Sequence, residues 1–505
     1  MLVGVTMLVE SVSGRRGAPA QPPAFAARRV VSAMVALALV LTLTSNPYGF
    51  ERDELYFRML RPAWGYVDQP PFTPLLARAA ALVSAEPWAG RIPATLAAVS
   101  SVLVLALITR EVGGRAVAQG LCAWSYAFAA IPLVFGHVLL TTSIDVVVWP
   151  LVCLFVIRAV LRDQPRWWLA AGLVLGLSTY NKLLVGLLVV ALVVGVLAVG
   201  PRSVLRNRRL WLAVALAVVL AVPNVVWQAT HDWPQLAMGR ALSDDNAATV
   251  RVIMWPYLLI LLGPPLTPVW VAGLVALWRR REWRHIRFLA VAFVVLLVET
   301  WVGGGQLYYP IGLLAVVFAI GCVPAAGFLA RSRAWRHTAW VLIPVNAVVS
   351  ALIALPLVPA SALASTPIPG INQTVADQIG WPEYVEQVAM VYRSVPASEH
   401  PVLLTSNYGE AGALVRYGPD LGLPRPYSAH NQLYFDRRPP DSTTTVVIVG
   451  GQFADVRDDF ATCEVRGRLH NRDDVDNEEV GEPVAVCRGP RAPWSRLWPR
   501  FQHYG

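Results

Sequence analysis

Apolar runs long enough to cross a bilayer recur along most of this 505-residue chain, from Val30 to Leu357. Lipid offers no partner for backbone amides, so a segment that crosses it must be a helix of about 20 mostly apolar residues. Hydrophobic residues make up 56% of the sequence and charged residues only 15%, a balance that excludes an ordinary soluble protein. The sequence therefore predicts a mainly α, multi-pass transmembrane protein.

Arginine clusters indicate which loops face the cytoplasm. We expect about eleven spans, and every second loop between them is basic, as the positive-inside rule requires of cytoplasmic loops. The tail 1–29 is expected to be cytoplasmic and disordered, and the odd number of spans puts the C-terminus outside the cytoplasm. Since these loops also explain the net charge of +10, nucleic acid is not expected as a partner. The expected span centres lie near Leu39, Val102, Phe128, Leu151, Leu173, Leu192, Leu216, Leu261, Val295, Leu314 and Val348.

The chain divides near Leu357, where hydropathy falls and polar residues and prolines increase. We expect a transmembrane domain over 30–357, with a large outward loop at 46–90, and a small extracytoplasmic α/β domain over 358–505. Helix-like segments (382–395, 410–418) alternate there with strand-like ones (401–408, 444–450). Cys463 and Cys487 lie in this domain, where a disulfide and two unlinked thiols are both compatible with the sequence.

Two adjacent carboxylates, Asp53 and Glu54, directly follow the first apolar run. A carboxylate in a partly dehydrated cleft can take a proton near neutral pH, which transfer of a group to a hydroxyl or amine requires. The alternative is a solvated charge cluster beside the membrane. Neighbouring residues do not share a face of a helix or strand, so the two acids should have different roles: Asp53 as the base, and Glu54 as the partner of an arginine or a metal ion.

Three further charged residues stand out in the outward half of the expected spans. Asp145 lies in an otherwise apolar run, where an ionisable group is costly and marks a functional path, unless it caps a helix. Lys182 is the only lysine in the chain, and its compact charge suits a phosphate oxygen, although it could also reach for lipid headgroups. Arg91 faces outward against the positive-inside pattern, so it needs either a carboxylate partner or an anionic headgroup, and we favour phosphate.

The motifs around these residues resemble those of the bacterial members of glycosyltransferase family 39. These are GT-C membrane enzymes, related to the protein O-mannosyltransferases and the lipid A aminoarabinose transferase. The resemblance runs through nearly the whole chain. It rests on FERDELYF (50–57), WGYVDQPP (64–71), GRIPATLAA (90–98), TTSIDVVVW (141–149), YNKLLVG (180–186), VPNVVWQ (222–228) with HDWP (231–234), LYYPIGLL (307–314), NYGEAGALVRYGPDLGLP (407–424) and SAHN (428–431).

This resemblance implies a lipid-phosphate sugar donor, a catalytic acid in the first outward loop and inversion at the anomeric carbon. Asp53 and Glu54 match the family's acidic pair, and Asp145 matches an acid that helps to bind the acceptor or a metal ion. Arg91 and Lys182 match basic positions near the donor phosphate. Gln69 and Tyr308 are further candidates for this phosphate site, although Gln69 stands where the aminoarabinose enzymes carry lysine.

The sequence thus predicts a membrane glycosyltransferase that moves a sugar from a polyprenyl-phosphate donor to an extracytoplasmic lipid, glycan or protein. The expected location is the plasma (inner) membrane, surrounded by membrane lipids. No cofactor is implied with certainty, and a divalent metal ion held by Glu54 and Asp145 is left open, because one acidic cluster without His or Cys does not define a site. The alternative is a transporter or flippase of lipid-linked saccharides, which would also need intramembrane acids and basic grooves.

Overall fold

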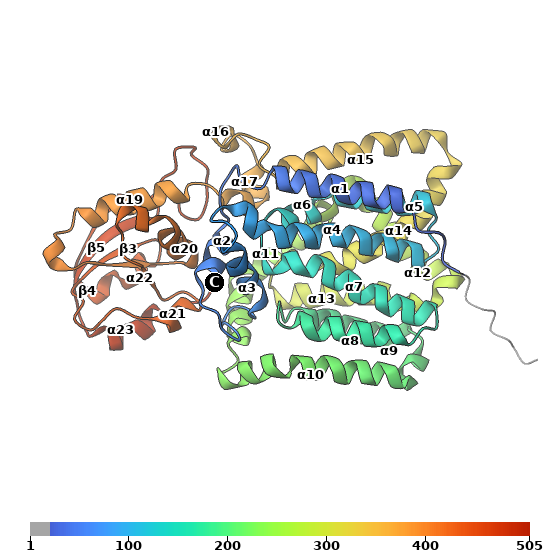
Figure 1. The fold of residues 1–505 in the computed structure, drawn as a ribbon, viewed down its shortest axis with the longest axis horizontal. Helices are drawn as coiled ribbons and strands as arrows, with labels where there is room; N and C mark the ends of the chain where they lie inside the picture. The colour runs from blue at the N-terminus through green and yellow to red at the C-terminus, as the bar shows by residue number, and fades with distance from the viewer. Residues whose placement is uncertain (1–20) are drawn as a thin grey trace, which may run out of the picture.

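The computed structural model describes residues 21–505, in which a bundle of long helices lies end to end with a smaller unit built on a sheet (Figure 1). The helices of the bundle are α1 (Ala27–Leu43), α4 (Pro87–Glu111), α5 (Ala116–Ala127), α6 (Ala130–His137), α7 (Thr141–Leu161), α8 (Arg166–Ser178), α9 (Val185–Val199), α10 (Arg208–Thr230), α11 (Pro234–Leu262), α12 (Thr267–Arg279), α13 (Phe288–Gly303), α14 (Ile311–Arg331) and α15 (Arg333–Ala354). Short 3-10 turns cover Arg202–Arg206, Pro264–Leu266 and Arg281–Ile286.

The start of the chain differs in part from the expected tail. Residues 1–20 lie outside the described residues, so the disorder expected there is not addressed. Within the rest of the tail, the Ala26 amide donates to the Gln119 side chain (2.9 Å) and α1 already begins at Ala27. The tail is therefore packed against the bundle before residue 29.

The bundle has the helices of a membrane protein. Within residues 21–505, six helices are long and apolar enough to cross a bilayer, or seven if the pair α5 and α6, bent by 51°, forms one span. α9 and α13 are apolar but shorter. Since a crossing takes about 20 helical residues, the expected count of eleven spans stays a prediction.

The expected span centred near Leu261 consists of two helices, α11 and α12. Gly263 breaks it with a φ of +91°, and a Cβ there would lie 1.7 Å from the Asn346 side chain, so only glycine fits. The Asn346 amide donates to the carbonyl oxygen of Leu262 (3.0 Å) and supplies a partner that the interrupted helix lacks. A hydropathy pattern does not reveal such a break, because the apolar run continues through it.

The inner and outer helices of the bundle differ in burial. More than half of the apolar stretch is buried in α4, α7 and α14, whereas α10 and α15 expose most of theirs. Small residues allow close contacts between helices: a Cβ on Gly273 of α12 would come within 2.3 Å of the Val317 carbonyl on α14, and one on Gly172 of α8 within 2.3 Å of the Ala213 carbonyl on α10. Such small-residue contacts are typical of helix packing in lipid.

The C-terminal unit is the expected α/β fold. Its helices are α16 (Ala360–Leu363), α17 (Ile368–Ile371), α18 (Gln373–Ala376), α19 (Trp381–Arg393), α20 (Tyr408–Tyr417), α21 (Leu433–Asp436), α22 (Phe453–Val456) and α23 (Trp494–Phe501), with 3-10 turns at Ala397–Glu399, Pro419–Leu421 and Arg457–Asp459. Its strands are β1 (Val402–Thr405), β2 (Tyr427–Ser428), β3 (Thr445–Val449), β4 (Phe460–Arg468) and β5 (Pro483–Pro490). The helix and strand segments expected from the sequence correspond to α19, β1, α20 and β3.

The five-stranded sheet has the order β2-β1-β3-β5-β4. β1 pairs in parallel with β2 and β3, whereas β5 is antiparallel to β3 and β4. Cys463 and Cys487 face each other across β4 and β5 and form a disulfide, which decides between the two states left open by the sequence. β4 was not predicted: it lies at the sheet edge with most residues exposed, so it lacks an apolar face.

Two short helices, α2 (Arg52–Met59) and α3 (Phe72–Ala81), form most of the segment between α1 and α4 and lie between the bundle and the sheet unit (Figure 1). α2 packs against α20 of the C-terminal domain and α3 against α4 of the bundle. At the opposite end of the bundle, Glu111 of α4 pairs with Arg158 and Arg162 of α7. The acidic first loop and the arginine-rich loops therefore lie at opposite ends.

Candidate functional site

The cap of α2 determines where its two carboxylates point. Glu51 is the N-cap: its side chain accepts from the Asp53 amide (2.8 Å), and its own amide donates to the Glu54 side chain (3.0 Å). Such a capping box fixes the first turn and favours acids near the helix N-terminus. Glu54 is thereby turned into the protein, while Asp53 stays partly exposed at the junction of the two domains.

Glu54 is an ion-pair partner, one of the two roles that the sequence predicts for it. Its carboxylate is 2% exposed and accepts Nε (3.0 Å) and Nη2 (2.9 Å) of Arg91, the Leu139 amide (3.0 Å) and the Glu51 amide. Both oxygens are therefore occupied by two donors each. A carboxylate bound in this way has no lone pair directed at a substrate.

Arg91 pairs with a carboxylate, one of the two kinds of partner that the sequence allows it. It is 1% exposed and donates from Nη1 to the Ser45 carbonyl (2.6 Å) and from Nη2 to the Gly49 carbonyl (2.7 Å), in addition to its bonds with Glu54. Nη1 also lies 3.1 Å from Nε2 of His137. The guanidinium is therefore enclosed by protein acceptors, which locks α2 onto α4.

Asp53 faces a different set of groups. The Tyr408 ring of the C-terminal domain packs against α2 beside it. The Tyr408 hydroxyl and the positive charges of Arg52 and Lys182 favour the ionised form of its carboxylate. Burial outweighs these effects and raises the pKa of Asp53 above its ordinary value. A carboxylate with a raised pKa is a stronger base, as a group that accepts a proton in a reaction should be.

Arg52 connects α2 to the C-terminal domain. Its guanidinium pairs with Glu478 and lies 4.8 Å from the centre of the Tyr408 ring. Burial raises the pKa of Asp377 to about 8, and the positive charge of the same arginine opposes this rise. One cation thus holds together acidic groups from two parts of the chain.

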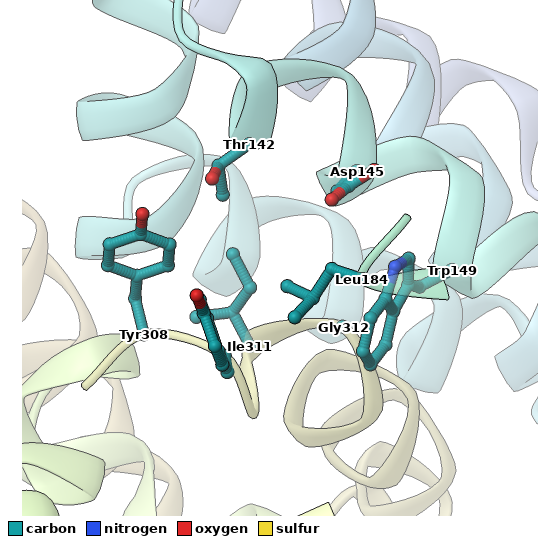
Figure 2. Close-up of a pocket in the computed structure, with 8 residues that line it drawn as sticks. Thr142, Asp145, Trp149, Leu184, Tyr308, Ile311 and Gly312 are labelled. Carbon is teal, nitrogen blue, oxygen red and sulfur yellow. The ribbon is translucent and has the colours of Figure 1, made fainter. Parts of the chain in front are cut away.

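Asp145 and Tyr308 line one pocket, and Lys182 lies beside it through its contact with Thr142. The pocket is small, about 10 Å³ in volume, and Figure 2 shows Asp145 and Thr142 of α7 facing Tyr308 across it. The Lys182 ammonium donates to Thr142 Oγ1 (3.1 Å) and lies 5.4 Å from the centre of the Tyr308 ring. Burial raises the pKa of Tyr308 to about 12, so it stays a neutral hydrogen-bonding group.

Asp145 is not a helix cap. Leu140 is the N-cap of α7, and Asp145 lies in the interior of the helix, 4% exposed. One of its oxygens accepts from the Asn181 amide (3.1 Å), while Oδ2 has no hydrogen-bond partner within residues 21–505. A buried carboxylate oxygen without a partner is costly and points to a bound group.

Gln69 lies in the loop between α2 and α3 and is buried, and its side-chain nitrogen lacks a partner in the described part of the chain. The neighbouring Asp68 lies close to the Tyr56 hydroxyl, and burial raises the pKa of its carboxyl group to about 7. Asp68 also senses the charge of Asp53, so it belongs to the same site. Asp68 was not predicted as a site residue, although an acid inside the aromatic motif WGYVDQPP (64–71) is a signal that could have indicated it.

The two candidates for a metal ion are not brought into one ligand set. Glu54 is occupied by Arg91, and Asp145 by Asn181 on one oxygen. Across residues 21–505, no group of three or more His, Cys, Asp or Glu side chains is arranged to hold a metal ion. The residues present at this site therefore do not fit a conventional metal centre.

One part of the chain matches a known protein family. Residues 68–227 match the family model described as dolichyl-phosphate-mannose-protein mannosyltransferase, which covers less than half of the chain. Among curated proteins, no significant sequence match is found.

Solved structures match over most of the chain. ArnT from Cupriavidus metallidurans in the apo state has a TM-score of 0.55 at 16% identity, covering 91% of this chain and 98% of that one. ArnT bound to undecaprenyl phosphate has a TM-score of 0.53 at 16% identity, with 90% and 97% covered. The arabinofuranosyltransferase AftD from Mycobacteria reaches 0.53 at 14% identity and covers 92% of this chain but 40% of its own.

At such low identities the structural likeness shows the fold alone. The family match and the fold agree with the resemblance inferred from the motifs: residues 68–227 are similar to the mannosyltransferase family, and the chain has the fold of the membrane glycosyltransferases ArnT and AftD.

Proposed function

We propose that this protein is a membrane glycosyltransferase that moves a sugar from a polyprenyl-phosphate donor to an acceptor outside the cytoplasm, with inversion. The observation that carries the proposal is the junction of the two domains. There, the partly exposed Asp53 carboxylate lies near Lys182 and beside the pocket of Asp145 and Tyr308. The solved complex of ArnT with undecaprenyl phosphate, which has the same fold, supports a donor of this class.

In the proposed reaction, Asp53 takes the proton of the acceptor hydroxyl or amine as its oxygen or nitrogen attacks the anomeric carbon. The new bond forms as the bond between that carbon and the phosphate oxygen breaks, so polyprenyl phosphate leaves with both bonding electrons. The Lys182 ammonium has three N–H donors, one directed at Thr142, and the others can bind the departing phosphate. Asp145 would hold the acceptor through its unpartnered oxygen.

A metal ion would supply charge stabilisation at the leaving phosphate, as divalent ions do in related chemistry. Because Glu54 and Asp145 are not joined with a third ligand in the described residues, we assign that role to Lys182 and Tyr308 instead. Gln69, with an unpartnered amide nitrogen, is the remaining candidate for the donor headgroup.

The proposed orientation puts the N-terminus in the cytoplasm and the C-terminal domain outside the plasma (inner) membrane. The bundle then has eleven spans, if α11 and α12 are counted as one span and α5 and α6 as another. The disulfide between Cys463 and Cys487 supports this side for the C-terminal domain, because such bonds persist in oxidising compartments. Asp53 lies at the same end of the bundle, where an external acceptor could reach it.

The function can be tested with the purified protein in lipid nanodiscs and a panel of undecaprenyl-phosphate-linked sugars. Release of undecaprenyl phosphate is measured with cell-envelope extract as acceptor, and mass analysis identifies the product. We expect Asp53→Asn to bind donor normally and to lose roughly 10²- to 10⁴-fold in turnover, the usual contribution of a positioned general base. Asp420→Asn, an exposed acid of the C-terminal domain, is the matched control.

Two outcomes would reject the proposal. If Asp53→Asn turned over at the parental rate, Asp53 would not be the base. If the parent carried lipid-linked saccharide across sealed vesicles without releasing undecaprenyl phosphate, the protein would be a transporter. Comparing surface glycans and glycolipids of strains with and without the protein would then identify the cargo or the product.

A further inference from the structure

Helix α20 of the C-terminal domain lies directly against the helix that carries Asp53. Two glycines permit this contact: a Cβ on Gly412 would lie 2.8 Å from the Leu55 backbone, and one on Gly409 would lie 3.2 Å from Cβ of Arg52. Contacts this short require glycine or a shift of the helices. The C-terminal domain is therefore fitted closely to the catalytic helix.

Tyr408 is the first residue of α20, and its ring is held on several sides. It packs 4.7 Å from the Tyr56 ring, stacks 5.0 Å from the His430 ring and lies 4.8 Å from the Arg52 guanidinium. Its backbone amide donates to Nδ1 of His430 (3.1 Å). The neighbouring Asn407 caps the helix through the Glu410 amide. Ring and backbone are thus fixed against the first turn of α2, where the Tyr408 hydroxyl favours the ionised form of Asp53.

We propose that Tyr408, supplied by the C-terminal domain, is a positioning residue that holds the Asp53 carboxylate in its reactive orientation. Its hydroxyl donates to one carboxylate oxygen and leaves the other free to take the proton of the acceptor. A catalytic group gains rate when it is held in place before the reaction, because no reorganisation is then needed. This inference rests on the proposed function and extends it by making the C-terminal domain part of the active site.

The restraint also has an electrostatic effect that can be measured. A hydrogen bond donated to a carboxylate favours its ionised form, so the Tyr408 hydroxyl lowers the pKa of Asp53 against the effect of burial. Activity is lost as pH falls through the pKa of the base. Removal of the hydroxyl raises the pKa of Asp53, and the acid limb of the rate profile moves to higher pH.

The test is Tyr408→Phe, which keeps the ring contacts and removes only the hydroxyl. In the nanodisc assay we expect the acid limb to move up by about one to two pH units, the shift that corresponds to one hydrogen bond to a charged group. We also expect kcat to fall while KM for the donor is unchanged. Tyr417→Phe, at the other end of α20, should leave both unchanged.

The parent enzyme separates the two levels of inference. If the parent does not transfer sugar from any polyprenyl-phosphate donor, the proposed function fails. If the parent is active and Tyr408→Phe keeps the parental acid limb, the positioning role is wrong, whatever happens to kcat. Should Tyr408→Phe not fold, 3-fluorotyrosine at position 408 keeps the size and strengthens the donor. The acid limb must then move to lower pH, and an unchanged limb would overturn the proposal.

Discussion

Replacing Glu54 by glutamine should destabilise this protein severely, although the change removes only a charge. In the folded chain, each Glu54 oxygen accepts two donors, and two of these four come from Arg91. The glutamine amide places an NH₂ group where one of those oxygens was. The two donors that were bound to that oxygen would then face the NH₂ group, which is itself a donor. The Arg91 guanidinium would also lose its buried counter-charge.

The size of the effect follows from burial. Glu54 and Arg91 are 2% and 1% exposed, so solvent can neither screen the uncompensated charge nor replace the lost partners. Removing one member of a buried pair costs about 3–5 kcal/mol. Since proteins are typically stable by only about 5–15 kcal/mol, the variant should lie near the limit of folding.

Thermal unfolding in detergent, followed by tryptophan fluorescence, measures this loss. The matched control is Glu86→Gln, which removes a carboxylate whose side chain is 60% exposed and whose contact with Arg416 is 4.0 Å. An exposed pair contributes about 0–1 kcal/mol, so the control should unfold close to the parent. If Glu54→Gln were as stable as the parent, and an Arg91 variant stayed folded but lost donor binding, the phosphate role that the sequence suggests for Arg91 would be right.

Three further predictions concern other parts of the molecule. Lys182→Ala should weaken binding of a polyprenyl-phosphate donor more than it lowers the unfolding temperature, because the contacts of the ammonium within residues 21–505 are Thr142 Oγ1 and two tyrosine rings. Unchanged binding would exclude Lys182 as a phosphate ligand. A reporter active only in the cytoplasm, fused after Leu357, should be inactive, and activity would reject the orientation. Since burial raises the pKa of Asp377 to about 8, the folded state holds this proton more tightly than the unfolded state, so its contribution to stability is lost as pH rises from about 4 to 8. Asp377→Asn should flatten that pH dependence, and an unchanged slope in the unfolding temperature would contradict it.

The helical bundle was predictable because it depends on properties that a sequence states directly. Length and hydropathy locate the helices, and the expected centres fall in or beside helices of the bundle. What hydropathy cannot show is a break satisfied by a distant group, such as Gly263 with Asn346. Bent or short helices likewise leave the span count undecided, since their apolar length falls short of a bilayer.

The candidate site was predictable residue by residue but not as a set of contacts. Adjacent carboxylates in a first turn must diverge, so different roles for Asp53 and Glu54 follow from helix geometry alone. Which of them pairs with Arg91 depends on the position of α4, and this position is determined by tertiary packing. Arg91 could have bound a phosphate or a carboxylate with the same fork of donors, and the sequence contains no measure of the distance to Glu54.

The contribution of the C-terminal domain is the least accessible to sequence reasoning. Tyr408 lies in a different domain from Asp53, and nothing in the type or spacing of either residue brings them together. The relation becomes visible only through backbone contacts: Gly412 lets α20 approach Leu55, and the capped first turn of α20 then places Tyr408 against the helix that carries Asp53. Glycine in a helix interior costs about 1 kcal/mol relative to alanine. Two glycines in one short helix are therefore explained by the approach that they permit, and that approach is what connects the C-terminal domain to the proposed base.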